Sequence, residues 1–397
     1  MGKLFIEDLN VKEKKVLMRV DFNVPLDSDL NVVDTTRIEA TLPSIRYVLN
    51  KGGSLILMSH LGRPRNAFVL ELSLKPVAGV LSSLLDKPVA MSPDCIGEKA
   101  QEMAKNLQPG DVLLLENLRF HRAEEHPEED LSFAQTLASY GDCYINDAFG
   151  TAHRKHSSTY AVPGYFPGKA AAGYLLEKEI QFIGDTLRSP ARPFFALIGG
   201  AKISTKIGVI HSLLKKVDGL IIAGGMAYTF LKAKNCLIGD SLLEEEFVPL
   251  AADLLKEYGE KILLPVDCVV AKECSQDVPN KIVTFSSGIP EGYQGLDIGP
   301  ASLQLFCDAL LKVKTVLWNG PFGVYEIDPF AKGTLVMAHF LAGLSAIKIV
   351  GGGDLIAAIR KAGVTEQMTH ISTGGGATLE YIEFGTLPGI QALSETN

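Results

Sequence analysis

Two lysines stand four positions apart after a pair of glycines in the stretch IGGAKISTKIG, residues 198–208. Glycine allows the backbone to come close to a phosphate group, and lysine brings a compact positive charge to it. Lys202 and Lys206 could therefore hold a phosphate near the start of a helix. The Walker pattern G-x-x-x-x-G-K-[ST] does not occur in the sequence, so a nucleotide has to be held by a different arrangement of segments.

Arginine is concentrated in the first part of the chain, where eight of the eleven arginines precede residue 160. Its planar guanidinium group binds carboxylate or phosphate through two parallel hydrogen bonds. Four apolar runs in this part end in polar or basic residues: KVLMRVDFN, SLILMSHLGR, VLLLENLRF and CYINDAFGTAHR. The polar residues at these ends are Asp21, Asn23, His60, Arg63, Arg119 and Arg154. The first part is therefore predicted to bind a small anion that carries several charges.

Glycine-rich turns follow most of the apolar runs in the second part of the chain. The runs read FFALIGGAK, GLIIAGGM, KILLPVD, TVLWNGPFG, IKIVGGGD and HISTGGG. At a turn between a strand and a helix, glycine lets backbone N–H groups face a phosphate, and the helix adds about half a positive charge. This part is therefore predicted to bind a nucleotide. Alternatively, Asp354 caps the helix that follows it, and STGGGATLE is one more turn before a helix.

The elements that carry these turns have the alternation typical of βαβ units. Short apolar runs alternate with helical patterns such as residues 37–52 and 130–141, which predicts an α/β protein with mostly parallel sheets and helices on both faces. A chain of 397 residues is long enough for two such doubly wound domains. Residues 173–187 have a helical apolar pattern and precede the prolines of SPARP, which predicts a bridging helix with hinge regions at its ends.

Composition narrows the possible partners and the compartment. The net charge of -8 argues against nucleic acid, which is bound by basic surfaces. The six cysteines show no C-x-x-C pair or metal-ligand spacing, so we expect reduced core residues and a cytoplasmic protein. No apolar stretch approaches the length of a membrane span, and we expect no membrane association. We predict that His153 and His156 lie in a loop, and assign structural roles to His121, His126, His211, His339 and His370.

Ten motifs follow one another in the order and approximate spacing of the phosphoglycerate kinase family. They are RVDFNVP, MSHLGRP, ENLRF, NDAFGTAHR, GGAK, AGGMAYTF, WNGPFGVYE, GGGD, STGGGA and LPGI. The chain resembles this family from about residue 4 to about residue 392. The resemblance implies a monomeric glycolytic enzyme that reversibly converts 3-phosphoglycerate and MgATP into 1,3-bisphosphoglycerate and MgADP.

The resemblance also implies a role for each part of the chain. Residues 1–172 would form the domain that binds phosphoglycerate, and the C-terminal tail, residues 380–397, would return to this domain. Residues 173–187 would form the bridging helix. Residues 188–379 would form the domain that binds the nucleotide. The implied phosphoglycerate ligands are Asp21, Asn23, Arg37, His60, Arg63, Arg119 and Arg154. The implied nucleotide ligands are Gly200, Ala201, Lys206, Gly225, Gly295, Asn319, Glu326, Gly351, Gly352, Gly353, Asp354 and Leu355, with Mg²⁺ on Asp354. The implied catalytic residues are Arg37, Lys202, Gly352 and Gly375.

Two positions depart from the pattern of the family. Leu355 stands where the family usually has Ser or Thr after GGGD, so we expect weaker nucleotide binding and an improvement on substitution by serine. The alternative is that this leucine packs against the helix that follows it. Arg122 stands where a proline is common, which we expect to be a loop difference without consequence for the reaction.

No general base is needed for the implied reaction, because a carboxylate nucleophile is already ionised at neutral pH. Two other functions remain open at this point. One is a different kinase that forms an acyl phosphate on a small carboxylate. The other is a two-lobed solute-binding protein without chemistry, against which the glycine-rich phosphate turns and the unpaired cysteines argue.

Overall fold

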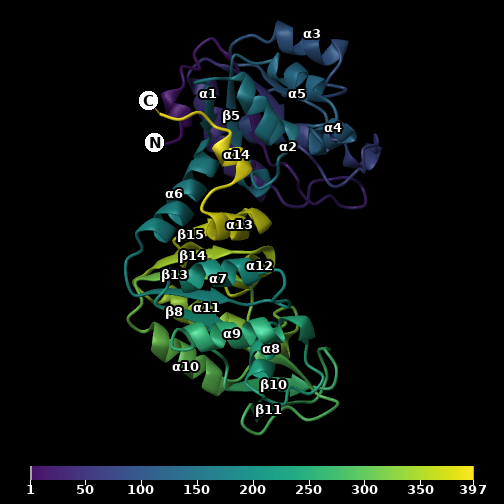
Figure 1. Cartoon of the computed structure of the whole chain (residues 1–397). Coiled ribbons are helices and arrows are strands. Elements are labelled where there is room, and N and C mark those ends of the chain that lie inside the picture. The colour runs from purple at the N-terminus through teal and green to yellow at the C-terminus, as the bar shows by residue number, and fades with distance from the viewer. Residues whose placement is uncertain (1, 397) are drawn as a thin grey trace. The chain divides into compact units, whose positions relative to one another are not determined.

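The computed structural model describes residues 2–396 and separates into two compact units. Unit 1 runs to Gln181 and takes up the chain again from Thr386, and unit 2 is Phe182–Gly385. Helix α6, Tyr174–Arg188, contains the boundary between them. Each unit has its own sheet with helices packed around it (Figure 1).

Unit 1 is built on a parallel sheet of six strands in the order β3-β4-β2-β1-β5-β6. The strands are β1 Lys15–Val20, β2 Ser54–Met58, β3 Ala90–Met91, β4 Val112–Leu114, β5 Cys143–Asp147 and β6 Ala170–Ala172. The chain places β2 on one side of β1 and later places β5 on the other. In open parallel sheets, ligands bind beyond the carboxyl ends of the strands at such a reversal. By this rule, a ligand of unit 1 binds beyond the carboxyl end of β1.

Unit 2 contains a second parallel sheet of six strands in the order β15-β14-β13-β7-β8-β9. These strands are β7 Phe194–Ile198, β8 Gly219–Ile222, β9 Ile262–Leu263, β13 Thr315–Asn319, β14 Ile347–Gly351 and β15 His370–Ser372. The order reverses between β7 and β13, as in a doubly wound dinucleotide-binding fold. A separate antiparallel sheet, β11-β10-β12, is formed by Asn280–Thr284, Asp267–Ala271 and Gln294–Ile298.

Helices connect the parallel strands in both units. Unit 1 contains α1 Thr36–Asn50, α2 Lys75–Leu85, α3 Glu98–Asn106, α4 Arg122–Glu125, α5 Leu131–Ala138 and α14 Pro388–Gln391. Unit 2 contains α7 Ile207–Leu214, α8 Ala227–Ala233, α9 Val248–Tyr258, α10 Pro300–Leu310, α11 Lys332–Ala342, α12 Gly353–Lys361 and α13 Gly376–Phe384. The expected α/β class with mostly parallel sheets is confirmed. The sequence pattern did not reveal the antiparallel sheet or the short strands β3 and β6.

The central strands are buried on both faces, as their continuous apolar sequences require. All five residues of β2 and all five of β13 are buried, and the cores of the two units are separate clusters of aliphatic and aromatic side chains. The cysteines are free, but the expectation that all six lie in the core is wrong, because Cys274 is exposed. Among the described residues, no helix is both long and apolar enough to cross a membrane.

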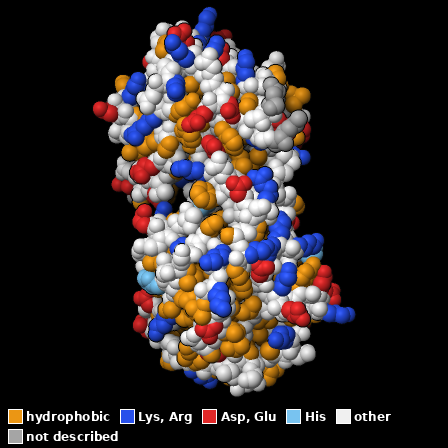
Figure 2. Space-filling model, turned by 90° about the vertical axis from the view of Figure 1, so that its left-hand side faces the viewer, with side chains coloured by type: hydrophobic (Ala, Val, Ile, Leu, Met, Phe, Trp, Pro, Cys, Tyr) orange, Lys and Arg blue, Asp and Glu red, His pale blue; other side chains and the backbone are white. Residues whose placement is uncertain are grey.

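One face of the molecule, shown in Figure 2, carries acidic and basic side chains mixed over both units. Hydrophobic side chains also reach the surface on this face and are more frequent over unit 2 than over unit 1. A mixed charge distribution of this kind is ordinary for a globular protein surface.

Candidate functional site

The polar ends of the strands in unit 1 lie at one edge of the sheet because the strands are parallel. Asp21 follows β1, and Arg37, in the first turn of α1, donates a hydrogen bond to its carboxylate. His60 follows β2, and its Nδ1 lies 3.9 Å from the same carboxylate. The side chain of Arg37 is 38% exposed and that of His60 is 5% exposed. The predicted residues Asp21, Arg37 and His60 therefore form one cluster.

A second group of predicted residues is joined through the backbone of Gly62. The N–H of Gly62 donates to Asn23 Oδ1 over 2.8 Å, and Arg119 donates to the carbonyl oxygen of Gly62 over 2.9 Å. Arg119, from the short helix Leu118–Phe120, and Arg154, beyond β5, approach the carboxylate of Glu125 at 3.3 Å and 4.0 Å. The predicted ligands Asn23, Arg119 and Arg154 are thus held in place before any anion arrives. The remaining one, Arg63, is exposed.

Concentrated positive charge affects the ionisation of the groups in this region. Burial lowers the pKa of Arg119 to about 10, and the negative charge of Glu125 opposes this shift. Burial and the nearby guanidinium groups of Arg19, Arg119 and Arg154 hold the pKa of His60 well below its usual value. His60 is therefore neutral at physiological pH, and it can donate or accept a hydrogen bond without adding a charge.

A buried polar network that the sequence pattern did not reveal lies next to this group. Arg19, on β1, is fully buried, and it donates to Ser158 Oγ over 2.8 Å and approaches His60 Nδ1 at 3.1 Å. The same Ser158 donates to Glu124 over 2.6 Å, so the buried carboxylate of Glu124 balances part of the arginine charge. His156 lies 3.9 Å from Glu124 and is also buried. The prediction that it is a loop residue holds, but the sequence pattern did not indicate its burial.

Unit 2 contains a cavity of about 260 Å³ at the carboxyl ends of its parallel strands. Of the predicted nucleotide ligands, it is lined by Gly200, Ala201, Gly225, Gly295, Glu326 and Asp354. Other walls come from residues that were not among the predicted ligands, although the motifs AGGMAYTF and WNGPFGVYE contain some of them. These residues are Tyr228, Leu242, Gln294, Leu296 and the segment Pro321–Tyr325. These additional residues supply apolar and aromatic surface that is suited to a flat ring, so this end of the cavity could hold a nucleobase.

Glycine is required at two walls of this cavity because other segments come very close. A Cβ atom at Gly295 would lie 1.9 Å from the Tyr228 hydroxyl, and one at Gly225 would lie 2.7 Å from the backbone oxygen of Ala201. Gly200 has a φ of 110°, in the region that favours glycine. Any larger residue at these positions would displace the cavity wall.

Lys206 lies beneath the glycine turn and faces the backbone of two strand ends. Its Nζ donates to the carbonyl oxygens of Gly199 and Asn319 over 2.7 Å and 3.3 Å. Burial lowers its pKa to about 8, although the negative charge of Asp354 acts in the opposite direction. An anion in this cavity would stabilise the charged form of the lysine. Lys202, by contrast, is exposed on the turn before α7.

The turns before α12 and α13 expose backbone donors in the way that phosphate binding requires. Gly352 and Gly375 precede these helices with φ values of 95° and 55°. Apart from the adjoining backbone, no atom of residues 2–396 lies within 4 Å of a Cβ built at Gly353 or Gly375, so the space in front of both turns is open. Asp354 lies in the first turn of α12 and is not its N-cap, since that position is taken by Gly352. The capping alternative for Asp354 is therefore wrong.

Asn319, at the end of β13, has a side-chain amide that is ready to donate. It is 3% exposed, and its Nδ2 finds no hydrogen-bond partner within the described part of the chain. A Cβ built at Gly352 would lie 3.4 Å from this nitrogen, which places the amide beside the turn Gly351–Gly353. A buried amide without a partner is costly, so an acceptor atom of a ligand would satisfy it.

Leu355 is fully buried and belongs to the core cluster of unit 2. Its side chain packs among residues such as Ile359 and Val350 instead of facing the cavity. This burial supports the packing alternative over the missing hydroxyl contact. The other departure from the family pattern is Arg122, which is the first residue of helix α4 and not a loop residue as expected. Its exposed side chain forms an ion pair with Glu129.

The arrangement can do one kind of chemistry particularly well. The basic side chains of unit 1 and the glycine-lined cavity of unit 2 are each suited to a phosphorylated molecule, and two such regions are typical of an enzyme that transfers a phosphoryl group. The phosphoglycerate kinase family model matches residues 6–384. The chain belongs to the phosphoglycerate kinase family.

Several relatives are similar over their whole length. The phosphoglycerate kinase of Chlamydia felis is 53% identical over 402 residues, covering 100% of both chains. That of Chlamydia muridarum is 52% identical and covers 99% of both. The solved structure of phosphoglycerate kinase from Coxiella burnetii has a TM-score of 0.89 at 37% identity, and the enzyme from Pyrococcus horikoshii has 0.84 at 32%, each covering 98% of both chains. The activity is therefore that of a phosphotransferase that acts on a carboxyl group.

Proposed function

We propose that unit 1 binds 3-phosphoglycerate, that unit 2 binds ATP or ADP, and that the residues predicted at the strand ends are their ligands. The observation that carries this division is the contrast between the strand ends of the two sheets. Those of unit 1 are held by charged side chains around Asp21 and Glu125, and those of unit 2 surround a glycine-lined cavity. Side-chain charge suits a small anion, and open backbone donors suit a polyphosphate.

In unit 1, phosphoglycerate presents two anionic ends to the basic group. Arg63 is exposed and can turn toward the phosphate, whereas Arg119 is already oriented by the carbonyl oxygen of Gly62 and Arg154 by the carboxylate of Glu125. Asp21 would accept a hydrogen bond from the hydroxyl group at the centre of the ligand, and the side-chain NH2 of Asn23 would donate one to it. Neutral His60 adds a hydrogen bond there without adding charge. Because Asn23, Arg119 and Arg154 are positioned by other protein atoms, these three lose little side-chain entropy on binding.

In unit 2, the base occupies the end of the cavity near Tyr228 and Gly295, and the phosphates extend toward the turn before α12. Asn319 Nδ2 donates to a phosphate oxygen and so gains the partner that it lacks. Lys206 supplies a positive charge that becomes more stable when the phosphates are bound. The N–H groups at the starts of α12 and α13 face the distal phosphates.

A magnesium ion fits the oxygen donors near the phosphates. Asp354 is an exposed carboxylate that lines the cavity, and Mg²⁺ in nucleotide sites is typically held by one or two carboxylates together with phosphate oxygens and water. When bound, the ion neutralises charge on the phosphates. Asp354 is the residue that would hold it.

Transfer itself depends on alignment and on charge. The carboxylate of phosphoglycerate is the nucleophile and is already ionised at neutral pH. During transfer, negative charge spreads over three oxygens of the moving group, where Arg37 from unit 1 and Lys202 from unit 2 neutralise it. Both side chains are at least partly exposed, so they can turn toward a ligand. Gly352 and Gly375 contribute backbone donors to the same group.

Each ligand is held by its own unit in this proposal, so the two units must bring their ligands together before transfer. The ends of α6 are the natural place for the backbone to change direction, since this helix contains the boundary. One chain supplies both sites, which supports a monomer. The six free cysteines support a reducing compartment such as the cytoplasm.

A coupled assay for ATP-dependent formation of 1,3-bisphosphoglycerate tests the proposal. We expect activity with 3-phosphoglycerate and a large loss of kcat/KM with glycerate, which lacks the phosphate that the arginines of unit 1 would bind. Equal activity with glycerate and other small carboxylates would instead identify a broader kinase that forms acyl phosphates. The absence of turnover with either acceptor would contradict the proposal.

A further inference from the structure

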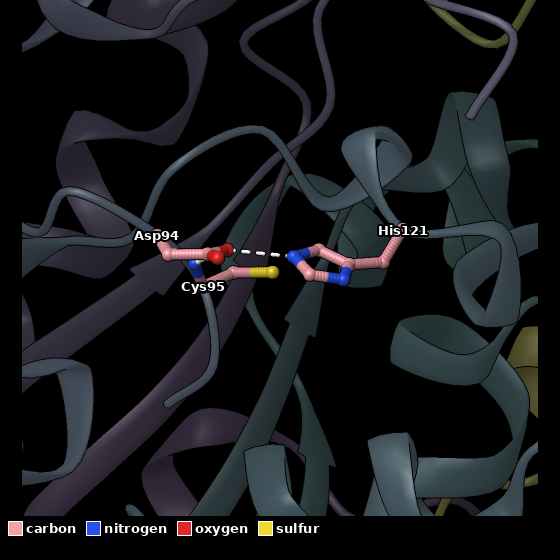
Figure 3. Close-up of side chains that lie close together, drawn as sticks. All are labelled: Asp94, Cys95 and His121. Carbon is pink, nitrogen blue, oxygen red and sulfur yellow. Dashed lines mark hydrogen bonds and ion pairs between the residues drawn. The ribbon is translucent and has the colours of Figure 1, made fainter. Parts of the chain in front are cut away.

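Three side chains with different donor atoms meet in unit 1 beyond the residues proposed to bind phosphoglycerate. Asp94 and Cys95 lie in the loop between β3 and α3, and His121 lies between the short helix Leu118–Phe120 and α4. A carboxylate oxygen, the sulfur and a ring nitrogen all lie within 4.8 Å of one another. Figure 3 shows the sulfur and the carboxylate turned toward the same edge of the imidazole ring.

We propose that Asp94, Cys95 and His121 form a binding site for a divalent transition metal of the zinc type. Zinc accepts thiolate, imidazole and carboxylate ligands together, and sites with three protein ligands leave a fourth position for water. Magnesium and calcium prefer ligand sets made entirely of oxygen. The mixed donor set therefore distinguishes this site from the carboxylate proposed to hold Mg²⁺ in unit 2.

The surroundings hold the three ligands in place and leave a way in for the metal. His121 Nε2 and Asp94 Oδ1 are hydrogen-bonded at 2.6 Å, and the ring packs against Phe133 with 5.5 Å between ring centroids. Cys95 is fully buried, whereas the side chains of His121 and Asp94 are 28% and 48% exposed. A metal can therefore approach from the side of the carboxylate, and its bond to sulfur would be shielded from water.

A second observation indicates that a polar partner is missing here. The hydroxyl of Tyr140 is buried and finds no hydrogen-bond partner among residues 2–396. Burial raises the pKa of Tyr140, and Asp94, or Cys95 once it is ionised, lies close enough to raise it further. A buried hydroxyl without a partner is unfavourable, and a water molecule on the fourth position of the metal could donate a hydrogen bond to its oxygen.

The hydrogen bond between His121 and Asp94 has a simpler explanation, which is that it fastens the loop to the start of α4. That explanation does not involve the thiol of Cys95, although its sulfur lies within 4.8 Å of both the carboxylate oxygen and the ring nitrogen. A cysteine thiol has an ordinary pKa of about 8.5, so Cys95 carries its proton at neutral pH when no metal is bound. The two accounts therefore differ in what happens to the proton on sulfur.

Metal binding at this site releases the proton of the Cys95 thiol. The Cys95 S–H bond breaks, the sulfur forms a bond to the metal as a thiolate, and one proton passes to the solvent. In a neutral His121 ring whose single proton lies on Nε2, facing Asp94, that proton moves to Nδ1 when the metal binds Nε2, so the ring gains and loses no proton. No oxidation or reduction takes place. One proton released for each metal ion bound is the expected stoichiometry for a neutral imidazole.

Cobalt(II) is a suitable probe because it replaces zinc and its bond to a thiolate absorbs in the near ultraviolet. We expect the full-length protein to bind one Co²⁺ with such an absorption band, and Zn²⁺ to displace it. Millimolar Mg²⁺ should leave the band unchanged. Calorimetry in buffers of different ionisation enthalpy should give about one proton released per metal ion. Zn²⁺ should also raise the melting temperature in a concentration-dependent manner.

Matched variants separate this site from adventitious binding. Cys95→Ser should abolish the absorption band and the proton release, and His121→Gln should weaken binding at least tenfold. The controls are Cys274→Ser, which removes an exposed thiol, and His126→Gln, which alters the exposed group His126, Glu128 and Glu129. Both controls should bind Co²⁺ like the unaltered protein.

Three results would overturn the inference. They are the absence of a thiolate band at stoichiometric Co²⁺, a band that survives in Cys95→Ser, and a band that disappears in Cys274→Ser. Because Cys95 is buried, the fold of Cys95→Ser is checked by its melting transition without metal. If that variant is unfolded, His121→Gln decides, since its side chain is partly exposed. Unchanged Co²⁺ affinity in a folded His121→Gln protein would then contradict the site.

Discussion

Replacing Leu355 by serine tests whether this position serves the nucleotide or the core of unit 2. The side chain is fully buried in the core cluster. Truncating a buried leucine to the size of alanine costs about 2 to 5 kcal/mol, and a buried hydroxyl without a partner adds about 1 to 3 kcal/mol. We therefore expect the free energy of unfolding to fall by at least about 3 kcal/mol.

This loss should be visible in thermal denaturation. For a unit of about 200 residues, 1 kcal/mol shifts the melting temperature by roughly 2 to 4 °C, so we expect the transition of unit 2 to move down by at least about 6 °C. The control is Leu355→Met, which nearly conserves volume and should cost less than about 1.5 kcal/mol. MgADP binding, measured by isothermal titration calorimetry, should be unchanged or weaker in the serine variant.

The opposite pattern would refute the packing argument. A serine hydroxyl that donates to a phosphate oxygen would contribute about 1.5 to 3 kcal/mol, which is a tenfold or greater decrease in Kd. A melting temperature within about 2 °C of the unaltered protein, together with such tighter binding, would show that the position serves the nucleotide. The burial of Leu355 would then be no guide to its role.

The other predictions concern catalysis, motion and pH. In steady-state kinetics, Lys202→Met and Arg37→Ala should each lower kcat by about a hundredfold or more and change KM less, because both charges act mainly on the phosphoryl group during transfer. A kcat within twofold of that of the unaltered enzyme would contradict the catalytic roles of these residues. Small-angle X-ray scattering should show the greatest compaction when both ligands are present, since each ligand binds one unit; equal compaction with nucleotide alone would contradict this. Burial, and then the charges of neighbouring arginines, lower the pKa of His156 to about 3, below the usual value near 6.5. The folded state therefore binds fewer protons than the unfolded state between these values, and stability should fall as pH drops from about 6.5 to 3, by at most roughly 1.4 kcal/mol per pH unit. In His156→Gln, denaturant titrations over this range should show a shallower decline, and an unchanged slope would count against it.

The sequence alone indicated the α/β class and two mostly parallel sheets. Strands that are buried on both faces must be apolar throughout, so runs such as those of β2 and β13 are recognisable without a structure. The antiparallel strand β11 escaped detection because most of its residues are exposed and show no apolar alternation. Strands β3 and β6 have two and three residues, which is too short for a periodic pattern.

Many candidate ligands could also be proposed from the sequence, for a geometric reason. Parallel strands end at a common edge, so polar residues such as His60 and glycines such as Gly352 are brought to that edge by the fold itself. Reading the ends of apolar runs therefore identifies candidates before their contacts are known. The resemblance to a family then supplied the roles that composition and spacing could not.

The tertiary structure decided which side chains are buried and which distant segments meet. The sequence suggested that Leu355 leaves the nucleotide without a hydroxyl contact. In the structure it is a core residue, because the first turn of α12 packs on the sheet. Glu124 balances part of the charge of Arg19 and is linked to it by hydrogen bonds through Ser158. His121 meets Asp94 and Cys95, and no local sequence signal indicated either contact. Contacts of this kind depend on chain topology, since each brings together residues from separate elements, and local patterns carry no information about them.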